Sequence, residues 1–461
     1  MAASIESLLA ELAEEEDPVE GLRSLRTAVF ATPVSSLRET LSVAQLGIIF
    51  SLLNTNDKEQ VEVCVEILGR VLEVLDPAHL ARNCRAELQS GLTHPDNSVK
   101  VLALTQIGRA VSDADGMSEV MNNPEILQEV IQCIGAESIG VSKKLVVEIS
   151  SVSPVSLGYC ASSSFVSKLL EELTGDDVLI RATAIEMVTS LAQSQHGRQY
   201  LAQQGVMDKI SNMIVGADSD PFSSFYLPGL VKFFGNLAIM DSPQQVCENY
   251  PAFLNMVFAM AMSPDSTQIP VALDTLGVLG GTVEGKQVLH KTGEQFNTVI
   301  KRMSRLAQDG ATDLRVRSLE AIAQLLTLPV EQQTDDLLLL TESWFCSLSS
   351  EPLEMIRSIS TQPFPELHCS ALRVFTAIAC QAWAQRMMIS SPGFAEWVME
   401  RSVSKGKEAK DCKFQLVGAL LSSSSTQEIF GAQNYLKLKT YLKEGPYFVN
   451  AIASVTTEGA D

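Results

Sequence analysis

The chain has 461 residues, of which 46% are hydrophobic, 6% aromatic and 19% charged, and its formal net charge is −21. The hydrophobic content supports a folded core, and the low aromatic content favours helices packed on helices. The negative charge repels phosphate backbones, so we expect no nucleic-acid partner and favour a basic partner. No run of 18 apolar residues occurs, so we expect no membrane-spanning segment.

The N-terminal residues 1–20 are acidic and have only a broken apolar stripe. They lack the basic start and the continuous apolar core of a signal peptide, so we expect them to form an N-terminal cap. The last residues, SVTTEGAD (454–461), predict a frayed tail. Between these ends we expect a single repeat array that, with its cap, covers residues 1–453.

Apolar stripes with helical spacing recur along the chain, and each follows a polar or basic start. In chain order they lie at 61–75, 100–111, 144–152, 181–192, 315–326, 368–379 and 412–420. A second pattern recurs at a spacing of 88 residues, or twice 44: HGRQYLAQQG (196–205) and EGKQVLHKTG (284–293) share a glycine, a basic residue, glutamine, leucine and a final glycine. Alternating apolar runs between hairpin turns are missing, which argues against strands.

These patterns predict a repeat of about 40–47 residues, the period of armadillo and HEAT arrays. We therefore expect an all-α solenoid, wound as a right-handed superhelix, whose stacked repeats share one core and have a concave and a convex side. The core should contain a small residue, a large neighbour and a large residue one turn later in each third helix. These positions are Ala103, Ala184, Ser318 and Ala371, then Leu104, Ile185, Leu319 and Leu372, then Ile107, Val188, Phe234, Ile322 and Phe375.

The third helices of such an array line its concave groove, and the repeat register predicts which of their residues face outward. One row is Thr105, Glu186, Lys232, Asp274, Glu320 and Arg373, and the next is Arg109, Ser190, Asn236, Val278, Gln324 and Ala377. The polar members of both rows are candidate partner-binding residues. Two interpretations stay open, because any exposed helix face is polar, whereas a groove with charges of both signs would suit a small folded domain.

The stretch DSDPFSSFYLPGLVKFFGNLA (218–238) holds the densest group of aromatic residues. We expect a third helix from Leu230 to Ala238, with Pro228 in its first turn. Phe222, Phe225 and Tyr226 precede that helix in a long connector. They either pack over the adjacent repeat or contact a partner, and we name them as candidate binding residues of the loop.

Two motifs raise the question of catalysis. GGTVEGKQ (280–287) fits part of a phosphate-binding loop, but it ends in glutamine and shares its EGKQ with the repeat. Ser404 and Lys407 have the spacing of a serine–lysine pair but lie in a polar run. The nine cysteines and five histidines are scattered without metal-ligand spacing, which favours buried reduced thiols. We expect no enzyme activity, no cofactor and no metal.

Several stretches of the sequence are similar to those of a known family. Among them are GADSDPFSSFYLPGLVKFFGNLAIMDSPQQ, RATAIEMVTSLA, PVEQQTDDLL and SSPGF. They resemble the family of 26S proteasome non-ATPase regulatory subunit 5 over almost the whole chain. The resemblance implies an armadillo/HEAT-like chaperone for assembly of the regulatory particle base. We expect a cytoplasmic location, with the nucleus as a second, open alternative. The resemblance also implies binding to the C-terminal small domain of an AAA ATPase, regulatory subunit 7, in a module with regulatory subunit 4 and non-ATPase subunit 2, and release before the particle is complete.

The chain departs from this family in one place, because it is about one repeat shorter near residues 135–145. Loss of a whole repeat leaves the neighbouring repeats able to stack, so we expect a folded protein with a shorter array. The alternative function is a generic armadillo adaptor that binds a basic extended peptide. That class uses ladders of tryptophan and asparagine, whereas tryptophan occurs here only at positions 344, 383 and 397.

Overall fold

The computed structural model describes residues 5–13, 18–40, 43–135, 140–162 and 164–449. Within these ranges the chain forms α-helices, short 3₁₀ helices and no β-strand, which confirms the all-α prediction. The expected tail at 454–461 lies outside the described residues, as do parts of the expected N-terminal cap.

The residues pack into two compact units, Met1–Val206 (unit 1) and Met207–Asp461 (unit 2), and each is described by itself. Both units repeat a group of three helices, which we call the first, second and third helix of a repeat. The repeats therefore have the three-helix arrangement typical of armadillo arrays. A single array over 1–453 and its right-handed winding stay predictions.

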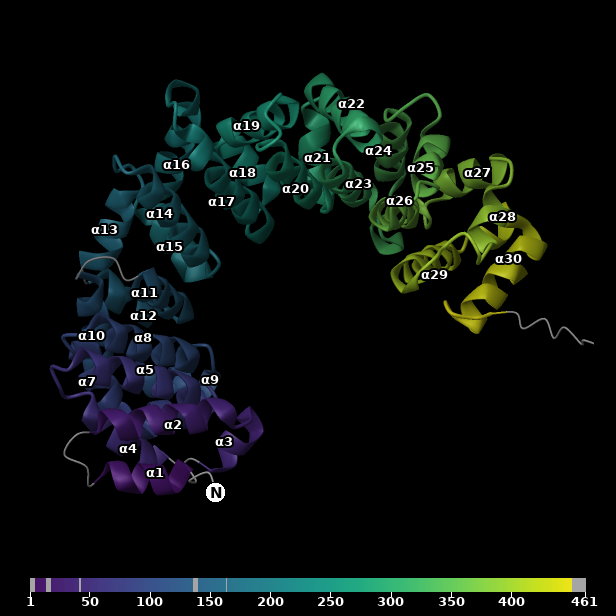
Figure 1. Ribbon diagram of the computed structural model, residues 1–461. Helices are drawn as coiled ribbons and strands as arrows, with labels where there is room; N and C mark the ends of the chain where they lie inside the picture. The colour runs from purple at the N-terminus through teal and green to yellow at the C-terminus, as the bar shows by residue number, and fades with distance from the viewer. Residues whose placement is uncertain (1–4, 14–17, 41–42, 136–139, 163, 450–461) are drawn as a thin grey trace, which may run out of the picture. The chain divides into compact units, whose positions relative to one another are not determined.

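Unit 1 contains five third helices, each packed against the next (Figure 1). They are α2 (Val19–Ala31), α5 (Lys58–Leu72), α8 (Asn97–Val111), α11 (Gly140–Val152) and α14 (Val178–Leu191). The second helices are α1 (Ile5–Leu12), α4 (Val43–Leu52), α7 (Arg85–Thr93), α10 (Pro124–Gly135) and α13 (Ser164–Glu172). The first helices are α3 (Val34–Thr40), α6 (Pro77–Asn83), α9 (Ala114–Met121), α12 (Pro154–Ala161) and α15 (Gln195–Gln203).

Unit 2 continues the same order of helices. Its third helices are α17 (Leu227–Met240), α20 (Ile269–Gly280), α23 (Thr312–Leu326), α26 (Pro365–Ile378) and α29 (Lys407–Ser422). The second helices are α16 (Val206–Val215), α19 (Pro251–Met262), α22 (Glu294–Asp309), α25 (Pro352–Ser360) and α28 (Phe394–Met399). The first helices are α18 (Pro243–Asn249), α21 (Val283–Lys291), α24 (Asp335–Cys346) and α27 (Ala382–Ser390). The helix α30 (Thr426–Glu444) packs against α27, α28 and α29.

The predicted core positions of the third helices are all buried, which confirms the repeat register. Small residues occupy the closest approaches, and large ones fill the space between repeats. The ring of Phe234 lies 5.6 Å from that of Phe253 on the second helix α19, and the ring of Phe375 lies 5.2 Å from that of Phe394 on α28. Phe234 is therefore a core residue, as expected.

The recurring HGRQ and EGKQ phrases lie where a first helix touches the end of the preceding third helix. The hydroxyl oxygens of Ser194 and Thr282 cap α15 and α21 and accept hydrogen bonds from the amides of Gly197 and Gly285 at 3.1 and 3.0 Å. A Cβ on Gly285 would lie 1.8 Å from the carbonyl oxygen of Leu279 in α20. Only a glycine lets the two backbones approach this closely.

The basic residue of the phrase binds the carbonyl groups that end the third helix. Arg198 donates to the carbonyl of Ala192 at 2.9 Å, just after α14. Lys286 is 1% exposed, and its Nζ donates to the carbonyls of Gly280 and, at 3.3 Å, of Gln324. The last carbonyls of a helix have no partner within the helix and carry partial negative charge. The phrase is therefore a helix-capping signal.

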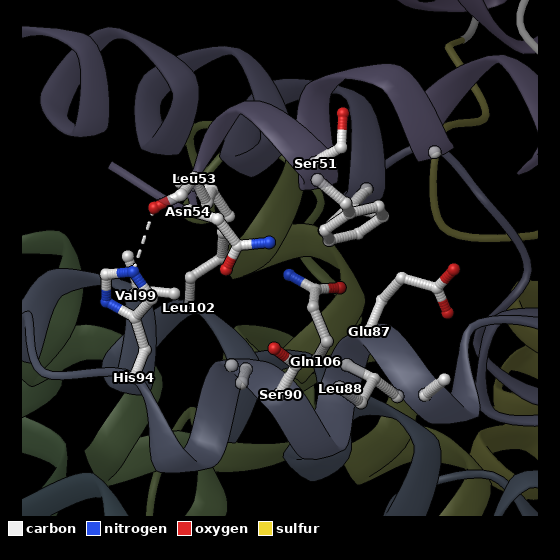
Figure 2. Close-up of a pocket in the computed structure, with 16 residues that line it drawn as sticks. Ser51, Leu53, Asn54, Glu87, Leu88, Ser90, His94, Val99, Leu102 and Gln106 are labelled. Atoms are coloured by element: carbon white, nitrogen blue, oxygen red, sulfur yellow. Dashed lines mark hydrogen bonds between the residues drawn. The ribbon is translucent and has the colours of Figure 1, made fainter.

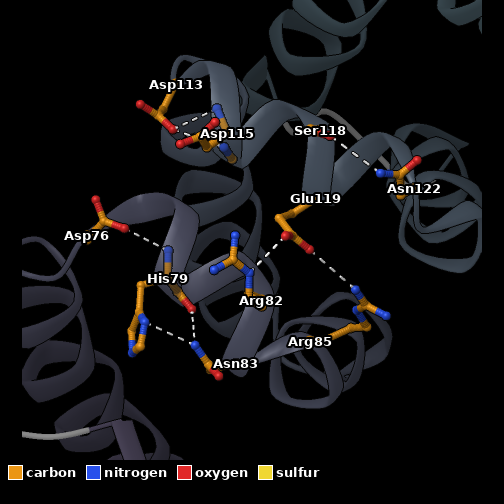
Figure 3. A network of polar contacts seen from close by, with 11 residues as sticks. Asp76, His79, Arg82, Asn83, Arg85, Asp113, Asp115, Ser118, Glu119 and Asn122 are labelled. Atoms are coloured by element: carbon orange, nitrogen blue, oxygen red, sulfur yellow. Dashed lines mark hydrogen bonds and ion pairs between the residues drawn. The ribbon is translucent and has the colours of Figure 1, made fainter.

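First helices of adjacent repeats are joined by ion pairs at the surface of unit 1. Arg82 on α6 donates from Nε to Glu119 on α9 at 2.8 Å, and Arg85 lies 3.7 Å from the same carboxylate (Figure 3). Asp113 accepts hydrogen bonds from the amides of Asp115 and Gly116 and caps α9. These contacts order the edge of the stack.

The junction where a repeat was expected to be missing joins a second helix, α10, to a third helix, α11. The helix α11 packs against both α8 and α14, so the row of third helices continues through the junction. Leu145, Val146 and Ile149 are buried there. Residues 136–139 of the expected junction lie outside the described residues. The described part of α11 is therefore packed like the other third helices, as we expected for a folded array that lacks one repeat.

We predict that Gly285→Ala destabilises unit 2, because its Cβ would lie 1.8 Å from a backbone oxygen and α21 would have to move. The expected loss is about 1–3 kcal/mol, as for overpacked cores. Gly158→Ala in α12 is the matched control, since no atom lies within 4 Å of its Cβ position. It should be neutral or stabilise by up to about 1 kcal/mol. Urea denaturation measures both changes, and equal effects would refute the close approach.

We predict that the stability of the wild type relative to Lys286→Met rises between pH 7 and pH 9. Burial lowers the pKa of Lys286 to about 8. Above that pH the folded chain loses the proton, whereas the unfolded chain keeps it up to the ordinary lysine pKa, so rising pH favours the folded state. The relative gain should be roughly 1 kcal/mol. Exposed Lys291→Met is the control for loss of a surface lysine, and urea denaturation at both pH values measures the two variants. A pH-dependent change of the same size in both would contradict the role of burial.

Candidate partner-binding surface

The predicted groove residues all lie on third helices, as the repeat register required. They are Thr105 and Arg109 on α8, Glu186 and Ser190 on α14, Lys232 and Asn236 on α17, Asp274 on α20, Glu320 and Gln324 on α23, and Arg373 on α26. We call the outward side of these helices the third-helix face. Its role in binding stays a prediction.

Ion pairs connect neighbouring third helices across this face in unit 2. Asp274 on α20 accepts from Arg317 on α23 at 2.7 Å. Arg373 on α26 lies 3.2 Å from Glu320 on α23 and 3.3 Å from Glu408 on α29. These side chains are partly exposed, so each pair contributes about 0–1 kcal/mol. The mixed charges of the face are therefore used, in part, between repeats of the chain itself.

Arg317 and Glu408 were not among the predicted site residues, although they complete these pairs. The hydrogen bond with Asp274 raises the pKa of the Arg317 guanidinium, and Asp313 one turn earlier adds to the effect. The signal in the sequence was present, because Arg317 precedes Glu320 by one helical turn on the same side. Its partner lies on another repeat and could not be identified from spacing alone.

Arg109 has a structural role that the sequence did not reveal. Its guanidinium donates to the carbonyl oxygens of Leu72, Glu73 and Leu75 at 2.7, 3.1 and 3.1 Å. It also donates to Oε1 of Gln106 at 2.7 Å. The expected outward groove residue thus caps the end of α5, and both terminal nitrogens of its guanidinium donate within the chain.

The other predicted groove residues differ in how they are bonded. The hydroxyls of Thr105 and Ser190 donate to carbonyls of their own helices, at 2.8 and 3.0 Å. Glu186, Lys232 and Gln324 are exposed, and Asn236 is half-buried. Within the described ranges Lys232 has no ion pair, so its ammonium group is available for an acidic group of a partner.

The connector before α17 is ordered by Asp220, and this decides how its aromatic rings lie. Its Oδ2 accepts from the Tyr226 hydroxyl at 2.7 Å, and its Oδ1 accepts from the amide of Phe222 at 2.9 Å. Tyr226 is only 4% exposed, whereas Phe222 and Phe225 are 56% and 61% exposed. Tyr226 is thus a packing residue rather than a contact residue. The two phenylalanines remain candidates.

In the two motifs that raised the question of catalysis, Lys286 and Ser404 make buried hydrogen bonds within the fold. Lys286 of GGTVEGKQ binds helix carbonyls and is buried, so its ammonium group is not presented to a phosphate. Ser404 is buried and bonds with Nε2 of His368 at 3.0 Å, while Nδ1 of His368 bonds with the carbonyl of Ser360 at 2.6 Å. Burial lowers the pKa of His368, which favours the neutral ring. Lys407 is exposed at the start of α29.

Most of the cysteines are buried thiols, as the sequence indicated. They are Cys64, Cys84, Cys133, Cys160, Cys247, Cys369 and Cys412. Burial raises the pKa of Cys64 to about 12, which makes its thiol unreactive. In the part of the chain that the structure describes, no group of three or more acidic, histidine or cysteine side chains is placed to hold a metal ion. No described helix is long and apolar enough to cross a bilayer.

The three tryptophans lie away from the third-helix face. Trp344 and Trp383 are on the first helices α24 and α27 and are buried, and Trp397 is on the second helix α28. A peptide-binding armadillo adaptor would carry its tryptophan ladder on the third helices, and the three tryptophans of this chain lie on other helices.

Comparison with known proteins identifies close relatives. The chain is 53% identical to the human protein named 26S proteasome non-ATPase regulatory subunit 5, and equally to the mouse protein of that name, covering 100% of both chains in each case. The Drosophila melanogaster protein of that name is 25% identical over 80% of this chain and 71% of its own. A chain in a solved structure of Kap95p with RanGDP has a TM-score of 0.58 at 15% identity, covering 95% of this chain and 53% of that chain. It supports the helical-repeat fold alone.

The same comparisons place the shortening of the chain. The alignment with the human relative has 504 positions, 43 more than the 461 residues present here, which is the length of one repeat. The profile of the family described as Proteasome non-ATPase 26S subunit matches residues 1–146 and 143–461 separately. The break between the two matches agrees with the expected loss of about one repeat near 135–145. Together they cover the sequence, and the chain belongs to the Proteasome non-ATPase 26S subunit family.

Proposed function

We propose that the chain is a chaperone for assembly of the base of the 26S proteasome regulatory particle. The observation that carries this proposal is the 53% identity, over both full lengths, with relatives named 26S proteasome non-ATPase regulatory subunit 5. The resemblance supplies the partner, which is the C-terminal small domain of the AAA ATPase regulatory subunit 7. Regulatory subunit 4 and non-ATPase subunit 2 complete the proposed assembly module, which we place in the cytoplasm.

We assign the contact with the ATPase domain to the third-helix face and the aromatic loop of unit 2. Lys232 supplies a free cation, and Phe222 and Phe225 supply exposed rings on a connector that Asp220 already orders. Aromatic residues held in place lose little entropy on binding and often dominate the affinity of an interface. Further along the same face, the ion pairs of Arg373 join α26 to α23 and α29.

The proposed mechanism is steric and thermodynamic. The chaperone covers one face of the ATPase small domain and prevents its premature contact with the proteolytic core. It leaves when the correct neighbours of the ATPase compete for that face. Such a cycle requires a higher affinity for the free ATPase than for the assembled one, because a ligand with equal affinities shifts no equilibrium.

We predict that the chain co-purifies with the isolated C-terminal small domain of regulatory subunit 7 and not with the completed 26S particle. The small domain of regulatory subunit 4 is the specificity control, since the proposal assigns the direct contact to regulatory subunit 7. The measurement is affinity capture with purified components. Capture of the completed particle at the same affinity would contradict the chaperone cycle.

We predict that Lys232→Glu, Phe222→Ser and Phe225→Ser each weaken binding of the subunit 7 small domain by about tenfold, as for residues at the centre of an interface. Calorimetric titration measures the change. Lys301→Glu on the second helix α22 and Leu339→Ser on the first helix α24 are matched controls, because both residues are exposed on other helices. Equal weakening by the controls would place the contact elsewhere.

A further inference from the structure

A hollow of about 260 Å³ opens in unit 1 between the second helices α4 and α7 and the third helix α8. Large apolar side chains form much of its wall, namely Phe50, Leu53, Leu72, Leu88, Val99 and Leu102. Gly47 on α4 and Gly91 on α7 also line it. Gly47 has open space at its Cβ position, whereas the missing side chain of Gly91 lets Ala103 on α8 come within 2.9 Å of where a Cβ would lie. The second helices α7 and α10, by contrast, pack directly on each other.

A buried amide donor faces this hollow. Gln106 lines the hollow (Figure 2) and is 2% exposed. Its Oε1 accepts a hydrogen bond from Arg109 at 2.7 Å. Because a guanidinium only donates, the amide oxygen must face Arg109 and the Nε2 group must face the other way. Nowhere in the described parts of the chain does a group accept a hydrogen bond from that Nε2. Since Gln106 lines the hollow, an acceptor placed there can take a hydrogen bond from this Nε2 group.

Arg109 holds the donor in place. Three backbone carbonyls at the end of α5 fix its guanidinium, and the guanidinium in turn fixes the amide of Gln106. The positive charge also polarises the amide and makes its N–H a stronger donor. The donor is therefore oriented before any ligand arrives.

The remaining polar groups indicate that the ligand is uncharged. No lysine or arginine lines the hollow, and the Glu87 carboxylate among its lining residues would repel an anion. The donor Nε2 of Gln106 and the Arg109 guanidinium bonded behind it disfavour a cation at this amide. Both ring nitrogens of His94 are occupied, one by the Leu53 carbonyl at 3.0 Å and the other by the Asp96 amide at 3.0 Å. The side chain of Asn54 adds a second neutral amide to the lining (Figure 2).

We propose that this hollow binds a small uncharged molecule with a compact apolar body and one hydrogen-bond acceptor, which Nε2 of Gln106 recognises. An engineered apolar cavity of about 150 Å³ holds benzene, so the larger volume here suits a ring with a short carbonyl substituent. The site lies in unit 1, and the proposal is independent of the ATPase partner assigned to unit 2.

Acetophenone and ethylbenzene test the proposal, because they match in size and only the first has an acceptor. Each is titrated into the full chain with labelled methyl groups, and the NMR signals of Leu53, Leu88 and Val99 report binding. Both probes should bind, acetophenone more tightly. Gln106→Met should weaken acetophenone by about 3- to 10-fold, the effect of one hydrogen bond, and leave ethylbenzene unchanged. Failure of both probes to bind, or equal responses of both probes to Gln106→Met, would overturn the proposal.

A second pair of variants tests the location of the site. Gly47→Leu should fill the hollow and abolish binding of both probes, since no atom lies within 4 Å of its Cβ position. Gly158→Leu is the matched control, because it is also a helical glycine with open space at its Cβ, on α12 and away from the hollow. It should bind both probes like the wild type. Undiminished binding by folded Gly47→Leu would place the ligand elsewhere and refute the assignment.

Discussion

The carbonyl groups at the ends of the third helices govern how one repeat joins the next. In several third helices these carbonyls are bonded by a side chain from a later element: Arg109 for α5, Arg198 for α14 and Lys286 for α20. In α23 the amide of Gln381 donates to the carbonyl of Leu326 at 2.7 Å. Since a buried unpaired carbonyl costs about 1–3 kcal/mol, these contacts are required wherever repeats bury their ends. The glycine before the basic residue follows from the same requirement, because the capping helix must approach the helix end closely.

This way of capping also affects the distribution of charge. Two lysines are buried because they bind backbone carbonyls. Lys286 is one, and Lys413 in α29 likewise donates to the carbonyls of Trp397 and Glu400, both at 2.6 Å. Burial lowers the pKa of Lys413 to about 8. The net charge of −21 comes from 55 acidic residues against 34 lysines and arginines, so carboxylates are in excess. A basic partner surface would therefore be favoured over an acidic one.

The sequence predicted the helices and the core well because both depend on local periodicity. Ala184, Ile185 and Val188 are buried where a helical stripe required it. The sequence predicted the site less well, because the state of a polar side chain depends on residues from another repeat. Arg109 was expected to be free and is bonded to α5, and Asp274 is paired with an arginine 43 residues away. The connector shows the same limit, since Asp220 buries Tyr226 and leaves Phe222 exposed.

By itself the sequence determined the all-α class, the repeat register, the identity of the core residues, the family and the place where a repeat is missing. Each of these is encoded by residue spacing along one helix or by strings of residues shared with relatives. Only the tertiary structure decided which outward residues remain free, such as Lys232, and which are bonded. It also decided that Gly47, Gly91 and the amide of Gln106 meet around one hollow. The physical reason is that contacts between helices depend on the distance between the packed helix backbones. The spacing of residues along one helix does not specify that distance.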